Sequence, residues 1–247
     1  MKAVTLFLVL LMAALTGCDD HQPTPINSNI TDTNPYPYTP DPNAPQIGGL
    51  TGATPKGGPL KSAREGPERS IFGVPGIDIN TFTLRVSGMV DSSLELTWPQ
   101  ILELPTATTD TMLMYCVEGW EVWGTWEGVL LDTLFSMAGI QPGAKYALLN
   151  TADGYSTSHE VAYLHKYNAM LAYKVNGEYL ANNDGFPLRL ICFGKFGYKW
   201  AKWVNDIELT NYNVLGFWEK NGYDDQALVP IERRIYFEGM NAEPIEY

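Results

Sequence analysis

Short segments in which apolar and polar residues alternate recur between residues 82 and 210, separated by turn-forming Gly, Pro, Asn and Asp. This period of two residues predicts half-buried β-strands. Residues 82–88 are the clearest example, because the alternation ends at a glycine that suits a turn. The other predicted strands are Leu94–Thr97, 111–115, Tyr146–Thr151, 169–175, 187–193 and Val204–Thr210. Asn176-Gly177 lies between two of these strands and is a strong hairpin signal.

Two segments follow the helical period instead. Residues 130–138 place leucines, Phe and Ala on one apolar face, and Gly139 closes the segment. Residues 98–104 form a shorter predicted helix, which Thr97 can cap and Pro105 stops. Many strands with few, short helices predict an α+β domain built mainly from mixed β-sheets.

The start of the chain has the features of a targeting segment. Residues 1–17 carry a single charge, Lys2, before an apolar core that is too short to span a bilayer stably. Leu15-Thr16-Gly17-Cys18 resembles a bacterial lipobox, in which the signal is cut before the cysteine and its thiol is acylated. An ordinary secretory signal and an uncleaved anchor are the alternatives. We therefore expect Cys18 to be lipidated and the protein to be anchored in the bacterial cell envelope, on the periplasmic or extracytoplasmic face.

Residues 18–67 differ in composition from the rest of the chain. Ten of the 17 prolines lie there, with Asn, Thr and Gly and little apolar content. Such a stretch cannot bury enough apolar surface to offset its ordering entropy, which predicts a disordered Pro-rich tether. The remaining residues, 68–247, are enough for one domain with a sizeable core.

Charge and cysteine content narrow the possible partners. The formal net charge of −12 argues against nucleic acid and against anionic membrane surfaces as partners, and it permits a neutral or cationic substrate and a basic redox partner. Apart from the lipobox cysteine, the chain has two cysteines, Cys116 and Cys192. The expected extracytoplasmic compartment tolerates disulfide bonds. A Cys116–Cys192 bridge is one hypothesis. Alternatively, Cys192 is a core residue of an apolar strand.

Residues 114–126 hold the most informative cysteine. Cys116 follows the predicted strand 111–115, with Glu118 two residues later and Trp120, Trp123 and Trp126 beyond. A thiol at the end of a strand, beside a carboxylate and large apolar side chains, is typical of a soft-metal ligand or a reactive thiol. A buried structural cysteine in an aromatic core is the plainer alternative, because free cysteines are commonly buried.

A second stretch gathers positive charge. Residues 189–202 contain four cations and no acid, namely Arg189, Lys195, Lys199 and Lys202. Interleaved glycines let a ligand approach the backbone, so the stretch suits a phosphate, although a solvated cationic face has the same composition. Residues 150–158 are expected to form a polar loop that turns at Asp153-Gly154. His159 and His165 are expected on a surface helix, at a spacing that does not favour a metal site.

Two of these stretches carry a family resemblance. Cys116-Val-Glu-Gly-Trp120, followed by Trp126-Glu-Gly-Val129, resembles the cysteine loop of the sulfite oxidase family, whose members carry molybdenum on a single pyranopterin. The second anchor is Gly194-Lys-Phe-Gly-Tyr-Lys-Trp-Ala-Lys-Trp203, and the likeness runs from about residue 81 to residue 223. The resemblance implies the sulfite-oxidase-type molybdopterin-binding fold and Mo-molybdopterin as the cofactor.

The resemblance also assigns roles to residues. Cys116 is the implied metal ligand. Beside it, we expect Glu118, Trp120 and Trp123 to shape the substrate side of the metal. The implied cofactor contacts are Thr151, Arg189, Gly197, Tyr198 and Lys199. Asp184 stands where the family usually has Asn or His, and it either points away from the phosphate or accepts a bond from a pterin N–H.

The expected activity is oxygen-atom transfer on a small neutral or cationic oxo-compound, such as a sulfoxide or an N-oxide. Sulfite is disfavoured because Glu118 is close to the metal ligand in sequence and no Arg or Lys occurs between Arg85 and Lys145. Electrons are expected from a separate electron-transfer protein, of which a membrane haem protein is one candidate. The competing hypothesis is a non-catalytic binding module without the metal, because no twin-arginine pair for export of a loaded enzyme precedes the apolar core.

Overall fold

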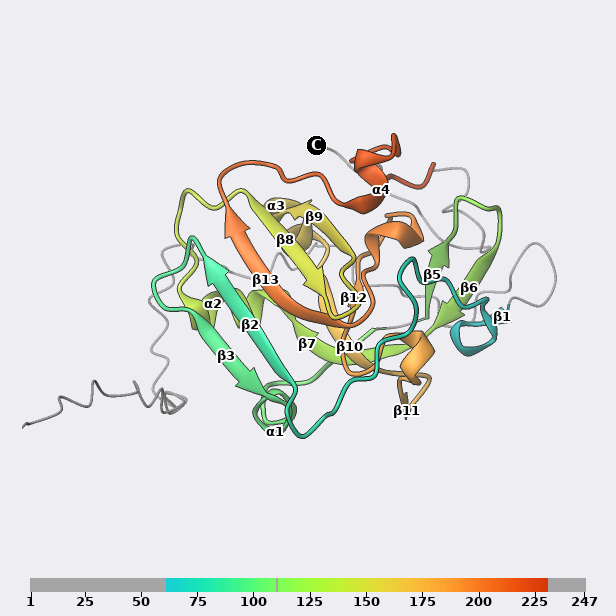
Figure 1. Cartoon of the computed structure of the whole chain (residues 1–247), viewed down its shortest axis with the longest axis horizontal. Coiled ribbons are helices and arrows are strands. Elements are labelled where there is room, and N and C mark those ends of the chain that lie inside the picture. Colours follow the sequence, from blue (N-terminus) through green and yellow to red (C-terminus); the bar gives the residue numbers. More distant parts are fainter. Residues whose placement is uncertain (1–60, 110, 231–247) are drawn as a thin grey trace, which may run out of the picture. The chain divides into compact units, whose positions relative to one another are not determined.

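The computed structural model describes residues 61–109 and 111–230 and arranges them in three β-sheets with short helices between them (Figure 1). The predicted signal peptide, Cys18 and residues 18–60 of the predicted tether lie outside the described residues. The chain divides into two units, and all described residues belong to the second. No helix in the described part is long and apolar enough to cross a membrane.

The first sheet has the strand order β3-β2-β13-β8-β9. Its strands are β2 (Thr83–Gly88), β3 (Leu94–Thr97), β8 (Tyr146–Thr151), β9 (Ser156–Glu160) and β13 (Val204–Thr210). β13 runs parallel to β2 and antiparallel to β8, so the sheet is mixed as predicted. Four of the five strands were predicted with nearly their observed bounds, because each alternates between the core and solvent.

β9 is the strand of this first sheet that was not predicted from the sequence. The predicted turn at Asp153-Gly154 is present, with Gly154 at a φ of 91°. The polar residues after it pair with β8 as a hairpin arm instead of continuing as a loop. His159 lies in this strand and is buried, so its predicted position on a surface helix was wrong. Buried hydrogen bonds, rather than apolar side chains, allow this polar strand to be covered.

The second sheet has the strand order β11-β10-β7-β4. A fifth strand, β12, also pairs with β10. Its strands are β4 (Ala107–Thr108), β7 (Trp126–Leu130), β10 (Met170–Val175), β11 (Glu178–Tyr179) and β12 (Arg189–Ile191). Asn176 and Gly177 join β10 to β11 with φ values of 53° and 82°, the left-handed conformation that a two-residue hairpin turn requires. The predicted turn is confirmed, but its second arm is the two-residue β11 and not the predicted strand 187–193, which appears as β12 and pairs with β10 separately.

The third sheet carries the cysteine loop. β5 (Met112–Tyr115) pairs with β6 (Glu121–Gly124), and β6 pairs in parallel with β1 (Lys61–Ser62). The loop between β5 and β6 is therefore held at one end of a hairpin. Because β1 is part of this sheet, the folded region begins before residue 68, where the sequence analysis placed the start of the domain.

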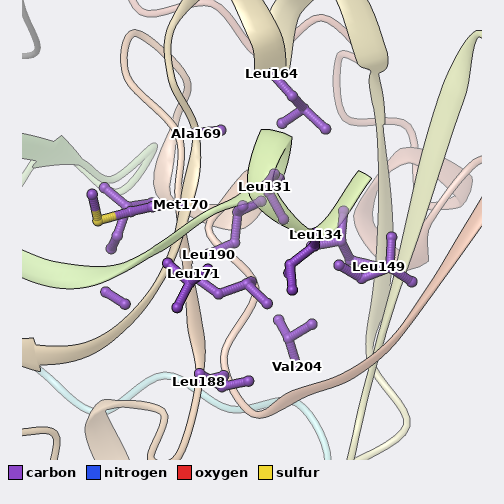
Figure 2. Packing of buried hydrophobic residues seen from close by; sticks show 14 of the residues in the cluster. Leu131, Leu134, Leu149, Leu164, Ala169, Met170, Leu171, Leu188, Leu190 and Val204 are labelled. Atoms are coloured by element: carbon purple, nitrogen blue, oxygen red, sulfur yellow. The ribbon is translucent and has the colours of Figure 1, made fainter. Parts of the chain in front are cut away.

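Short helices cover and connect the sheets. They are α1 (Trp98–Leu102), α2 (Leu131–Ala138), α3 (Val161–Lys166) and α4 (Phe217–Lys220), with 3₁₀ turns at Ala63–Glu65, Asn182–Asp184 and Gly197–Lys199. The two predicted helices are confirmed, and Gly139 ends α2 in the left-handed conformation. The apolar face of α2 packs into a cluster with side chains from β8, β10, β12 and β13, which forms the main core (Figure 2).

Candidate functional site

Most of the residues singled out by the sequence analysis line one cleft. The residues shared by the prediction and the cleft wall are Cys116, Glu118, Trp120, Asp184, Arg189, Gly197 and Tyr198. They come from the β5–β6 loop, the 3₁₀ turn at Asn182–Asp184, the first residue of β12 and the 3₁₀ turn at Gly197–Lys199. The cleft encloses about 1180 Å³, counting the part that is open to solvent.

Cys116 is placed by a tight turn at the end of β5. Its N–H donates to the Trp120 carbonyl at 2.9 Å, and Gly119 closes the turn with a φ of 91°. The Glu118 N–H points to Sγ at 3.5 Å, and the thiol is only partly buried. Burial raises the pKa of this thiol and the Glu118 carboxylate adds to the rise, while the Glu118 N–H opposes it. The turn thus presents an accessible sulfur to the cleft.

The disulfide hypothesis is wrong for the described structure. Cys116 and Cys192 are both free. Cys192 has 0% exposure in the core, which confirms the alternative prediction. Its Sγ lies 3.7 Å from Nδ1 of the buried His159. Burial raises the pKa of Cys192 to about 12, so this thiol stays protonated and inert.

Glu118 has a partner that the sequence analysis missed. Its Oε2 accepts hydrogen bonds from Trp120 Nε1 at 2.9 Å and from Arg69 Nε at 2.9 Å. These two contacts lower the pKa of the Glu118 carboxyl below its ordinary value. No Arg or Lys lies near Glu118 in the sequence, but the structure brings the Arg69 guanidinium to its carboxylate. Arg69 lies 49 residues before Glu118, and no local motif marks a contact over that distance.

Residues 66–71 form a strap along the cleft and attach to it through two opposite charges. Arg69 pairs with Glu118, while Glu68 accepts from Lys202 Nζ at 2.9 Å. Lys202 also donates to the Asn183 carbonyl at 3.0 Å. Burial lowers the pKa of Lys202, and the nearby Arg189 charge lowers it further. The strap thus places the Arg69 guanidinium near Cys116 and the Glu68 carboxylate beside Lys202.

Arg189 is a buried cation at the cleft wall. Its Nη1 donates to the Asp184 carbonyl at 3.1 Å, its Nη2 faces the weak acceptor Met114 Sδ, and the guanidinium lies 5.5 Å from the Trp126 ring centroid. Its Nε has no hydrogen-bond partner among the described residues. Burial lowers the pKa of Arg189 to about 10, and the Asp184 charge opposes this. An incompletely paired buried cation is expected to bind an anion, and a cofactor phosphate fits this requirement.

Two predicted cofactor contacts have side chains that are engaged elsewhere. The Thr151 hydroxyl donates within the β8–β9 turn, to Asp153 and to the Tyr155 carbonyl. The Lys199 ammonium is buried and bonded to Glu219 and Asp225. Neither residue lines the cleft, whereas Asp153 and Tyr155 do. Cofactor contacts through the Thr151 and Lys199 side chains are thus not supported, and contacts through the backbone of the Gly197–Lys199 turn remain a prediction.

The fold and the site together define a molybdopterin-binding oxidoreductase domain. Residues 71–218 match the family described as the oxidoreductase molybdopterin binding domain, and the chain belongs to this family. The chain is 33% identical over 147 residues to the uncharacterized oxidoreductase YuiH of Bacillus subtilis, covering 59% of this chain and 74% of YuiH.

Two further comparisons cover a smaller share of the other protein. The protein-methionine-sulfoxide reductase catalytic subunit MsrP of Gluconobacter oxydans is 26% identical over 161 residues, covering 58% of this chain and 52% of MsrP. Among solved structures, the sulfane dehydrogenase SoxCD from Paracoccus pantotrophus matches with a TM-score of 0.57 and 26% identity, covering 60% of this chain and 42% of that chain. The chain thus spans about half of MsrP and less than half of the SoxCD chain.

Membership in this family identifies the chain as a molybdenum cofactor-dependent oxidoreductase of the sulfite oxidase type. When bound, the cofactor supplies a metal that exchanges electrons with the substrate. Cys116 fits the metal because a thiolate is a soft ligand, and Arg189 fits the phosphate. No group of three or more His, Cys, Asp or Glu in the described residues offers a competing metal site.

Proposed function

We propose that the protein reduces a small neutral or cationic oxo-compound, such as a sulfoxide or an N-oxide, by oxygen-atom transfer. The observation that carries this proposal is the position of the Cys116 sulfur in a cleft with apolar walls and a fixed carboxylate. Trp120, Trp218 and Tyr223 provide aromatic surfaces for the apolar groups of a substrate. The similarity to MsrP, a protein-methionine-sulfoxide reductase catalytic subunit, supports the same class of substrate.

Glu118 is the candidate proton-relaying group. Its Oε2 is 4.0 Å from Cys116 Sγ, and the carboxylate is half exposed to solvent. Reduction of a sulfoxide to a sulfide and water consumes two electrons and two protons, so a titratable group beside the reacting oxygen is useful. Trp120 and Arg69 hold the Glu118 carboxylate in one orientation, which favours proton transfer at a defined position.

The charge of the cleft supports a neutral or cationic substrate. Its walls carry four carboxylates and three cations, namely Glu68, Glu118, Asp153, Asp184, Arg69, Arg189 and Lys202. A dianion such as sulfite therefore meets no excess of positive charge near Cys116, even though Arg69 neutralises Glu118. The case against sulfite thus rests on the balance of the whole cleft rather than on an isolated Glu118.

Substitution of Glu118 tests the substrate and the proton relay together. In molybdenum-loaded protein with a reduced dye as electron donor, Glu118→Gln should lower kcat for sulfoxide reduction by about a hundredfold, the scale of a lost group that relays protons. Sulfite oxidation should be slow in the unmodified protein and should become faster in this variant, because a negative charge is removed. Efficient sulfite oxidation that Glu118→Gln barely changes would contradict the proposed substrate class.

Arg69→Gln tests the electrostatic link between the strap and Glu118. Arg69 stabilises the ionised carboxylate, so its removal should raise the pKa of Glu118. The step that belongs to Glu118 in the pH–rate profile should consequently move to higher pH, and Glu118→Gln identifies that step by abolishing it. An unchanged step in Arg69→Gln would mean that the ion pair does not influence the reacting carboxylate.

We further propose that Cys18 anchors the protein in the cell envelope and that a separate electron-transfer protein supplies the electrons, with a membrane haem protein as one candidate. The lipobox-like Leu15-Thr16-Gly17-Cys18 supports the anchor. Ile71 and Val117, which are 39% and 43% exposed at the cleft, offer an apolar surface for such a partner.

Cys18→Ser should move the protein from the membrane fraction to the soluble fraction, because the acylated thiol is lost. Immunoblots of fractionated cells measure this, and Cys192→Ser serves as a matched control that stays with the membrane. Persistent membrane association of Cys18→Ser would mean that residues 1–17 are retained or that another surface binds the membrane.

A further inference from the structure

Two aromatic walls of the cleft belong to one short segment near the end of the described chain. Trp218 and Tyr223 both line the cleft, and their ring centroids are 4.7 Å apart. We call residues 216–226, which include α4, the aromatic arm. Its start approaches β9 closely, because a Cβ atom at Gly216 would lie 2.2 Å from the Ser156 carbonyl oxygen.

The buried ammonium of Lys199 fastens this arm to the rest of the domain at two carboxylates, and the buried Lys195 adds a contact to the Gln226 carbonyl at 2.6 Å. Lys199 Nζ donates to Glu219 Oε1 at 2.5 Å and to Asp225 Oδ1 at 3.1 Å, and both acceptors belong to the arm. Its third partner is the Ser158 carbonyl of β9, at 3.0 Å. The side chain of Lys199 is 1% exposed and that of Glu219 is 0% exposed. An ammonium has three N–H donors, so these three acceptors use all of them.

Neighbouring contacts join the same arm to the same turn. Tyr198 donates from its hydroxyl to the Asp224 carbonyl at 2.6 Å, and its ring lies 5.4 Å from that of Tyr223. Glu219 Oε1 also accepts from Thr157 of β9 at 2.7 Å. The Gly197–Lys199 turn, β9 and the aromatic arm therefore share one buried polar network.

We propose that Lys199 is a positioning residue, which locks the aromatic arm to the Gly197–Lys199 turn and thereby holds Trp218 and Tyr223 as the substrate-facing wall of the cleft. Buried charges are costly unless they are paired, so lifting the arm would take both carboxylate partners away from the ammonium and leave it with the Ser158 carbonyl. The arm is consequently held in place by this ion-pair network, together with the hydrogen bonds from Tyr198 and Lys195 to its backbone. This inference rests on the proposed use of the cleft for substrate.

The test removes both buried charges together, because either one alone would be left unpaired. The variant is Lys199→Met combined with Glu219→Gln. Hydrogen exchange of residues 216–226 should become at least about tenfold faster as local opening is eased. In sulfoxide reduction with a reduced dye, KM should rise about tenfold with kcat within about twofold, the pattern of lost substrate binding. The molybdenum content should stay at the level of the unmodified protein.

Two further variants help to interpret the double variant: a control in another ion pair and a milder substitution in the same network. Lys174→Met combined with Glu127→Gln removes another pair with a 2.5 Å contact, in the second sheet and away from the cleft, and should leave KM unchanged. Asp225→Asn keeps the Lys199–Glu219 pair and should give a smaller change in the same direction if the double variant does not fold.

Two outcomes overturn the proposal. Loss of molybdenum with unchanged exchange of the arm would make Lys199 a cofactor ligand, and lower thermal stability with unchanged KM would make the network merely structural. If the protein reduces no sulfoxide at all, the proposed function fails, but hydrogen exchange and molybdenum content still decide whether Lys199 fastens the arm.

Discussion

Cys116→Ser should abolish molybdenum-dependent turnover while the domain stays folded. A hydroxyl is a harder and less acidic ligand than a thiol, so it replaces the thiolate poorly on a metal that binds sulfur. Loss of a supporting contact in a metal site already costs about ten- to a hundredfold, so loss of the ligand itself should cost at least about a hundredfold in activity. Only part of the Cys116 side chain is buried, and the turn around it is closed by backbone hydrogen bonds, so folding should be unaffected.

Cys192→Ser is the control for this substitution. Its sulfur lies in the core beside His159 and does not line the cleft. The variant should keep both molybdenum and activity, with a small loss of stability because a hydroxyl is buried in place of a thiol. Circular dichroism, metal analysis and dye-linked turnover of the two variants, measured side by side, provide the comparison. Equal loss of activity in both would show that Cys116 has no special role.

Arg189→Met should have opposite effects on the protein with and without its cofactor. In the loaded protein, the substitution removes a charge-assisted contact of about 1.5–3 kcal/mol, so cofactor affinity should fall by about ten- to a hundredfold. In the cofactor-free protein, it replaces a buried, incompletely paired cation by an apolar side chain. Such replacements are often neutral or stabilising by about 1–4 kcal/mol, so the free energy of unfolding should stay equal or rise.

Metal analysis of the purified protein and urea unfolding of its cofactor-free form measure the two effects. Arg85→Met is the matched control, because Arg85 is 59% exposed in its pair with Asp206 and does not line the cleft. It should change neither quantity. If Arg189→Met retains the full cofactor content, the phosphate site has been assigned to the wrong residue.

The fold could be predicted from the sequence wherever one face of a strand is buried and the other is exposed. β3, β8 and β13 have their predicted bounds for this reason. β6, β7 and β9 were not predicted as strands. β6 alternates between half-buried and buried positions but has only four residues, β7 does not alternate strictly, and β9 is polar because hydrogen bonds satisfy its buried groups.

The site could be predicted in part because its cysteine loop is continuous in the sequence. Cys116, Glu118 and Trp120 lie on one tight turn, so a local motif describes them well. Arg69 could not be found in this way, because the strap reaches Glu118 through the tertiary fold. The sequence analysis also treated the cations of residues 189–202 as one phosphate-binding group. The structure directs Arg189 and Lys202 to the cleft and Lys199 into a buried ion pair, a difference that depends on backbone direction rather than composition.

The most direct test of the central claim is the relation between molybdenum content and sulfoxide-reducing activity in protein loaded with cofactor to different degrees. With a reduced dye as donor, turnover per chain should rise in proportion to bound molybdenum, pass through the origin and reach its maximum at stoichiometric metal. Full turnover in preparations without molybdenum, or no sulfoxide reduction in fully loaded protein, would contradict the account.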